Sequence, residues 1–209
     1  MKGGNIKKIS RLIGYFATHP LMLKTYIRKS INNSATPISL ELPWISFAAI
    51  QFLEKFLQPS LNVAEFGGGG STLFFAKRTA SVLCVESHKD WVEKIETALA
   101  LNNISNVRIE GHTFDPKDQE AYASSSYLQS IEGQSYDVIL VDGYEEYVEL
   151  RPTCFYRAEK CVKKGGIIIV DDSWRYLSLR KNNNAQNWKE FRSIGPCRPG
   201  VTTTDIFFY

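Results

Sequence analysis

Cysteine is scarce in this sequence: its 209 residues include four cysteines, and no two of them form a Cys-x-x-Cys pair. Structural zinc sites commonly use such pairs, and a chain of this length does not need a disulfide framework in order to fold. We therefore expect a cytoplasmic protein with reduced thiols at Cys84, Cys154, Cys161 and Cys197.

Long apolar runs are also missing, since none reaches the roughly 18 residues of a membrane-spanning helix. The stretch from Leu12 to Leu23 is interrupted by Thr18-His19-Pro20, and it lacks a small-residue cleavage site. We expect neither a transmembrane segment nor a signal peptide.

Acidic residues are absent from the first 31 residues, which carry seven Lys and Arg. Ile6, Ile9, Ile13 and Phe16 recur there at helical spacing, and His19-Pro20 marks a break. We expect one or two basic amphipathic helices that pack on the main domain. The alternative is peripheral contact of residues 1–31 with an anionic membrane surface or an acidic partner.

A further helix is expected from Trp44 to about Leu57, because Pro59 stops it. We therefore divide the chain into an N-terminal helical cap, residues 1–58, and a main domain, residues 59–209. Hydrophobic residues make up 44% of the sequence, which is enough for a sizeable core.

Short apolar runs recur every 20 to 30 residues in the main domain, with room for a helix after each. They cover residues 61–66, 81–86, 106–111, 136–142 and 166–172. This rhythm is typical of βαβ units in an α/β protein, and predicts a Rossmann-like, doubly wound and mostly parallel sheet. The tail, 191–209, predicts two more strands in an antiparallel hairpin that turns at Pro199-Gly200, giving seven strands.

Acidic residues lie at or beside the ends of four of these runs. They are Glu65, Glu86, Asp142, Asp171 and Asp172. Ligands of open parallel sheets bind outside the carboxyl ends of the strands, so we expect these acids to collect at one ligand-binding edge.

Four consecutive glycines, Gly67 to Gly70, follow the first run and precede a predicted helix. A phosphate loop of the Walker type requires a lysine after the last glycine, and here Ser71 follows. A dinucleotide fingerprint, Gly-x-Gly-x-x-Gly/Ala, would place its third small residue at Thr72 or Leu73, and neither fits. The glycines therefore indicate close approach of the main chain to some other polar ligand.

The spacing Glu65-x-Gly67-x-Gly69-x-Ser71 resembles motif I of the class I S-adenosylmethionine-dependent methyltransferases. Glu86, 21 residues beyond Glu65, and the segments 137–143 and 163–172 match later elements of that family, so the resemblance covers residues 61–209. It implies that Gly165-Gly166 forms the turn into the fifth strand. It also implies that residues 59–209 form an S-adenosylmethionine-binding methyltransferase domain.

The same resemblance assigns roles to individual residues. The methionine part of the cofactor would be held by Glu65 and the loop, and the ribose hydroxyls by Glu86. The adenine would lie near Ser87, His88 and residues 111–114. The implied cofactor-binding residues are Glu65, Gly67, Gly68, Gly69, Ser71, Thr72, Glu86, Ser87, His112 and Asp142.

The acceptor atom is suggested by the residues after the fourth predicted strand. The Asp/Asn-Pro-Pro-Tyr/Phe signature of N-methyltransferases is absent, and residues 142–145 read Asp-Gly-Tyr-Glu instead. Together with Asp171-Asp172 this is similar to small-molecule O-methyltransferases of the catechol and caffeoyl-coenzyme A type. In those enzymes acids at these positions bind a divalent cation such as Mg²⁺.

Two departures weaken that cation site: Asp172 stands where the family has Asn, and Glu145 and Glu146 stand where it has a lysine. Adjacent strand residues point to opposite faces, so Asp171 and Asp172 can act together only if the strand has ended. Without a metal, Asp142, Asp171 or Asp172 would serve as the catalytic base or orient the acceptor. A helix N-cap is the structural alternative for Asp172.

A small molecule or a glycan is the expected acceptor, because the arrangement also looks like a bacterial group linked to glycan and secondary-metabolite tailoring. Residues 174–191, basic and aromatic, could bind it through Arg175, Arg180, Lys181 or Trp188. The net charge of +3 gives no reason to expect a nucleic-acid partner. Two other functions stay open: a nicotinamide-dependent oxidoreductase, and a non-catalytic member that binds through its basic N-terminus.

Overall fold

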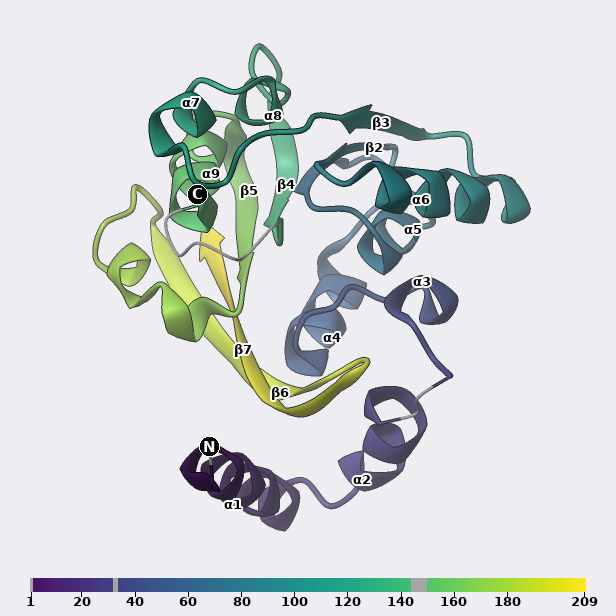
Figure 1. Ribbon diagram of the computed structural model, residues 1–209, viewed down its shortest axis with the longest axis vertical. Helices are drawn as coiled ribbons and strands as arrows, with labels where there is room; N and C mark the ends of the chain where they lie inside the picture. The colour runs from purple at the N-terminus through teal and green to yellow at the C-terminus, as the bar shows by residue number, and fades with distance from the viewer. Residues whose placement is uncertain (1, 32–33, 144–149) are drawn as a thin grey trace.

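A single seven-stranded sheet organises the computed structural model, which describes residues 2–31, 34–143 and 150–209 (Figure 1). The strand order is β3-β2-β1-β4-β5-β7-β6, with β7 antiparallel to both neighbours and all other pairs parallel. The strands are β1 (Asn62–Phe66), β2 (Ser81–Glu86), β3 (Val107–Gly111), β4 (Tyr136–Val141), β5 (Val162–Asp171), β6 (Asn187–Gly195) and β7 (Arg198–Phe208). The predicted α/β class, the parallel part and the final hairpin are confirmed.

Helices precede the sheet and connect its strands. They are α1 (Lys2–Thr18), α2 (Met22–Thr25) with a π-helical turn (Tyr26–Ser30), α3 (Pro37–Leu40), α4 (Phe47–Phe56), α5 (Gly70–Ala76), α6 (Lys89–Leu101), α7 (Gln119–Ala123), α8 (Ser126–Gln129) and α9 (Leu150–Ala158). None of those within the described ranges is long and apolar enough to cross a membrane. The expected break at His19-Pro20 is present. The helix α4 begins three residues later than predicted, because Ser46 caps it by accepting a bond from the Ala49 amide.

Helices cover both faces of the sheet, as a doubly wound fold requires (Figure 1). Alternate residues of each strand enter different cores: Ala64 and Phe66 pack with α9, whereas Val63 packs with α4 and α5. The helix α1 adds Leu12, Tyr15 and Phe16 to the α4 side. The N-terminal helices therefore contribute to the packing of the sheet.

Two sequence predictions about turns are wrong. The hairpin turns at Pro196-Cys197, with Gly195 opposite Arg198, and not at Pro199-Gly200. Pro199 is tolerated inside β7 because that part of the strand pairs only with β6, leaving its other edge without a partner strand. Gly165-Gly166 likewise lies inside β5, beside a shift in the β4–β5 register, where a Cβ on Gly166 would lie 2.8 Å from the Asp137 carbonyl oxygen.

Gly70, the first residue of α5, touches the segment that carries α3. A Cβ added there would lie 2.2 Å from the Pro37 carbonyl oxygen and 2.3 Å from that of Leu42. We predict that Gly70→Ala lowers the free energy of unfolding by about 2 kcal/mol, because two backbone carbonyls would have to move. Urea denaturation measures this.

The matched control is Gly14→Ala in α1, where nothing lies within 4 Å of the added Cβ. That exchange should leave the free energy of unfolding unchanged or raise it by about 0.5–1 kcal/mol, since alanine is the better helix former. Equal destabilisation by both exchanges would contradict the contact described.

Candidate functional site

A cavity of about 730 Å³ opens at the carboxyl ends of β1, β2 and β4. This is where ligands of doubly wound sheets bind, and the volume suits a small molecule of cofactor size. Its lining combines the glycine loop with charged and aromatic side chains: Pro37, Trp44, Gly67, Gly68, Gly69, Gly70, Ser71, Glu86, His88, Asp90, Trp91, Lys94, Asp142, Gly143, Arg151, Asp172 and Arg198.

The glycine loop is shaped by contacts within the protein. Gly67 has φ of +85°, and a Cβ there would lie 2.6 Å from the Asp142 carbonyl oxygen, so only glycine fits. Three successive loop amides also donate inward: Gly67 to the Val85 carbonyl at 2.8 Å, Gly68 to Glu86 Oε2 at 2.9 Å, and Gly69 to Thr72 Oγ1 at 3.0 Å. The amides of these three glycines are therefore already bonded and do not form an anion cradle.

Glu65 lies beneath the loop and is not part of the cavity lining. It is fully buried; Oε1 accepts a hydrogen bond from Thr72 Oγ1, and Oε2 has no hydrogen-bond partner among the described residues. Burial raises the pKa of Glu65 to about 7, and hydrogen bonds from neighbouring side chains offset only part of that rise. The same Thr72 hydroxyl accepts a hydrogen bond from the Gly69 amide. Glu65 therefore acts on the loop indirectly, by fixing the position of the Thr72 hydroxyl.

Glu86, at the end of β2, lines the cavity, unlike Glu65. Its Oε1 accepts from the Ser87 amide at 2.7 Å and the His88 amide at 2.9 Å, and its Oε2 accepts from Gly68. A carboxylate offers about four acceptor positions. One position, on Oε2, is therefore left for a hydroxyl of a bound ligand, one fewer than two ribose hydroxyls would need.

The predicted residues beyond β2 are only partly brought together. Ser87 and His112 do not line the cavity, and His112 Nε2 lies 3.1 Å from Glu110 Oε2. The first turns of α6 take that place: Trp91 lines the cavity, and its ring nitrogen donates to the Gly68 carbonyl. The sequence signal that could have indicated Trp91 is that the helix α6 follows directly after Glu86, so its first residues lie next to the glycine loop.

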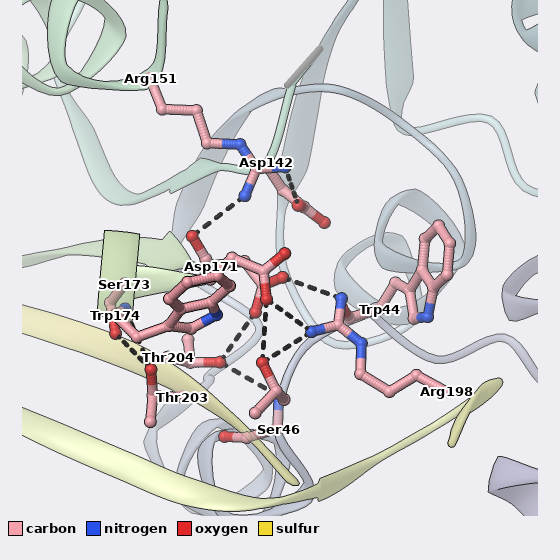
Figure 2. A network of polar contacts seen from close by, with 12 residues as sticks. Trp44, Ser46, Asp142, Arg151, Asp171, Ser173, Trp174, Arg198, Thr203 and Thr204 are labelled. Atoms are coloured by element: carbon pink, nitrogen blue, oxygen red, sulfur yellow. Dashed lines mark hydrogen bonds and ion pairs between the residues drawn. The ribbon is translucent and has the colours of Figure 1, made fainter. Parts of the chain in front are cut away.

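Two arginines hold the acidic edge of the sheet (Figure 2). Arg151, buried in α9, lies 3.0 Å from Asp142 Oδ1 and donates to the Asp171 carbonyl oxygen at 3.0 Å. Arg198, at the start of β7, reaches Asp171 Oδ2 at 3.1 Å and Asp172 Oδ1 at 2.8 Å. No local sequence pattern indicates Arg198, because it lies 26 residues beyond Asp172 and reaches it only when the hairpin folds back.

Asp171 and Asp172 can share one arginine because β5 ends between them. Asp172 has φ of +49°, which turns its side chain toward the same side as that of Asp171. Asp172 stands at the N-cap position of a short 3₁₀ helix, Ser173–Arg175, as the structural alternative expected, but its side chain makes no capping hydrogen bond. Asp171 is fully buried and outside the cavity lining, whereas Asp142 and Asp172 face the cavity.

The three acids differ in their affinity for a proton. Burial raises the pKa of Asp142 well above its ordinary value, with Arg151 opposing the rise. Burial also raises the pKa of Asp171, again against an arginine, Arg198. For Asp172 burial acts in the same direction, but Arg198 and a hydrogen bond from Thr202 outweigh it, so its pKa is lowered. Of the two cavity acids that these arginines contact, Asp142 therefore holds a proton more readily than Asp172.

The expected Mg²⁺ site does not fit these residues. The guanidinium groups of Arg151 and Arg198 already occupy the carboxylates that would bind a cation. In the described part of the chain, no group of three or more His, Cys, Asp and Glu is placed to hold a metal ion. Glu145 and Glu146, the other residues named for this site, lie outside the described residues.

A second cavity, of about 440 Å³, adjoins the first at Asp172 and Arg198. Arg11 of α1, Arg192 of β6 and the half-exposed Trp174 ring also line it. In the segment expected to bind an acceptor, Arg180 is instead fixed by Asp205, 2.6 Å away, and lies over the Trp188 ring. Trp174 therefore offers an aromatic ring of that segment to this cavity.

Comparisons with known proteins agree with this fold. No protein-family model and no curated protein matches the sequence. Among solved structures, a candidate O-methyltransferase from Klebsiella pneumoniae is 15% identical, with a TM-score of 0.58 over 78% of this chain and 77% of that one. A candidate methyltransferase from Streptococcus mutans, in complex with S-adenosylhomocysteine, is 13% identical with a TM-score of 0.56, over 84% and 99%.

An rRNA methylase from Streptococcus thermophilus is similar as well, at 12% identity and a TM-score of 0.56, over 83% of this chain and 97% of that one. Identities this low concern the fold alone. The chain has the fold of the class I S-adenosylmethionine-dependent methyltransferases, which the sequence resemblance had predicted.

The buried carboxyl of Glu65 predicts a pH-dependent stability. Its pKa is raised from an ordinary value of 4.5 to about 7, so the folded state holds a proton that the unfolded state releases between these pH values. Its contribution to stability is complete below pH 4.5 and is lost as the pH rises through 7. Relative to Glu65→Gln, the wild type should lose about 3 kcal/mol across this interval.

Urea denaturation of both proteins between pH 4.5 and 8 measures this difference, with Glu54→Gln at an exposed position of α4 as the matched control. A wild type that gains stability relative to Glu65→Gln as the pH rises would show that the buried carboxyl is paired and ionised.

Proposed function

We propose that this chain is an S-adenosylmethionine-dependent methyltransferase that methylates an oxygen atom of a small molecule or glycan. The observation that carries the proposal is the cavity at the carboxyl ends of β1, β2 and β4, where Glu86 and the glycine loop meet. Residues 59–209 would form the methyltransferase domain and residues 1–58 its helical cap. The cytoplasmic location expected from the cysteines stays a prediction.

The glycine loop of the cavity is poorly suited to a phosphorylated ligand. The cavity lining contains four acids, Glu86, Asp90, Asp142 and Asp172, and three basic residues, Lys94, Arg151 and Arg198. The amides of Gly67 to Gly69 are bonded within the protein. A dinucleotide needs free loop amides for its pyrophosphate and would meet the Glu86 carboxylate instead. S-adenosylmethionine has no phosphate group and does not need those amides. The nicotinamide-dependent alternative is therefore the weaker one.

The residues present fit that cofactor in a specific way. The bare main chain of Gly67, Gly68 and Gly69 would lie along its methionine part, with Ser71 beside it. Glu86 Oε2 would accept one ribose hydroxyl, and Trp91 would pack against the adenosine. Glu65 and Thr72 would hold the loop from below. Ser87 and His112 would take no direct part, because they do not line the cavity.

Oxygen acceptors must lose a proton when they attack, and Asp142 is the group in this cavity suited to take it. Bound S-adenosylmethionine supplies an electrophilic methyl group on a sulfonium. Asp142 would accept the acceptor's hydroxyl proton on its carboxylate, while Arg151 fixes the orientation of that carboxylate. Asp171, which is buried away from the cavity, would act only by holding Arg198. No metal is needed in this scheme.

The acceptor would approach through the second cavity. Asp172 and Arg198 belong to both cavities, so an acceptor bound there would lie next to the cofactor cavity. The Trp174 ring offers it a stacking surface, and Arg11 and Arg192 offer positive charge. The lining suits an aromatic or sugar-like molecule with an anionic group. That the acceptor is not a nucleic acid stays a prediction.

The test of cofactor binding is calorimetry with S-adenosylhomocysteine. We predict micromolar binding by the wild type and a roughly tenfold or greater loss for Glu86→Ala, because a hydrogen bond to a charged group is worth about 1.5–3 kcal/mol. Glu110→Ala, on the neighbouring strand β3 and outside the cavity lining, is the matched control and should bind as the wild type does.

Circular dichroism would establish that each variant is folded before titration. Titration with NADH under the same conditions tests the alternative. Wild-type protein that binds NADH but not S-adenosylhomocysteine would overturn the proposal.

A further inference from the structure

Large apolar side chains are exposed along the N-terminal helices. In the described residues between 9 and 31, six of them are at least 44% exposed, and Leu21 reaches 90%. They are Ile9, Ile13, Leu21, Leu23, Ile27 and Ile31. Isolated exposed apolar residues are ordinary, but six within 23 residues form a concentration that usually marks a binding surface.

These residues are not needed for packing on the sheet. A different set of side chains from the same helices already packs against the core beneath the sheet: Leu12, Tyr15, Phe16, Met22 and Tyr26. The N-terminal helices therefore carry apolar residues toward the core and also toward solvent. An amphipathic helix that only caps a domain requires the first set alone.

The exposed apolar residues lie among basic ones. Leu21, Leu23 and Ile27 surround one surface groove together with Pro20, Lys24 and Arg28. Residues 1–31 contain seven Lys and Arg and no acidic residue. In Figure 1, α1 and α2 lie together at the lower end of the molecule, beyond the hairpin of β6 and β7. Apolar side chains flanked by basic ones fit an anionic lipid surface.

A second copy of the chain fits this surface poorly. Most symmetric dimers place the same patch of both copies face to face, and two such basic patches would repel each other. An anionic bilayer has a negative surface potential, which attracts the basic residues around the groove. It also has an apolar layer just below the headgroups, into which the leucines can insert. We propose that residues 9–31 dock on anionic bilayers and lie in the interface without crossing it. This inference does not depend on the methyltransferase activity.

The test is sedimentation of the full-length protein with vesicles of phosphatidylglycerol and phosphatidylcholine in equal amounts. Wild type should bind, and Leu21→Ser/Leu23→Ser/Ile27→Ser should bind about tenfold or more weakly, because three inserting side chains are lost. Lys24→Gln/Arg28→Gln/Lys29→Gln should lose about a hundredfold, since each basic residue near an anionic surface contributes about fivefold. Vesicles of phosphatidylcholine alone should not retain the wild type.

Leu101→Ser is the matched control, because Leu101 of α6 is 79% exposed and lies outside the groove. It should bind vesicles as the wild type does. Equal binding by the wild type and both triple variants, or no binding by the wild type, would overturn the proposal. A wild-type dimer in analytical ultracentrifugation that becomes monomeric in the leucine variant would also overturn it, because the surface would then belong to a second copy.

Discussion

Charge neutralisation by Arg151 and Arg198 is the constraint on which the ligand-binding edge depends. Parallel strands bring their carboxyl ends together, and here that places Asp142, Asp171 and Asp172 within reach of two guanidinium groups. A buried carboxylate without a partner is costly, so removal of either arginine would destabilise the fold or leave these carboxyls protonated. The hairpin of β6 and β7 completes the sheet and also places Arg198 next to these acids (Figure 2).

Much of this architecture could be predicted from the sequence. Apolar runs at regular spacing predict five parallel strands, and the acids at their ends predict the edge where the cavity lies. Those signals are local, because residues that are close together in the sequence show both that a strand is buried and which residue ends it. The turn at Pro196-Cys197 was missed because Pro199-Gly200 is the stronger turn signal, and only the pairing with β6 tells the two apart.

Long-range partners could not be predicted in the same way. The contact of Arg198 with Asp171 depends on how the hairpin folds back, and the inward hydrogen bonds of the loop amides depend on where Glu86 and Thr72 lie in space. The sequence therefore identified the glycine loop and Glu86 but not how they cooperate: Glu86 accepts from Gly68 and orders the loop while it faces the cavity. The central claim is that these two features together hold an adenosyl sulfonium amino acid.

The most direct measurement is a crystal structure of the protein soaked with S-adenosylhomocysteine. The account predicts the ligand along Gly67 to Gly69, with one ribose hydroxyl within hydrogen-bonding distance of Glu86 Oε2 and the loop amides still bonded inward. Ligand density elsewhere on the molecule, or a ribose that makes no contact with Glu86, would contradict it.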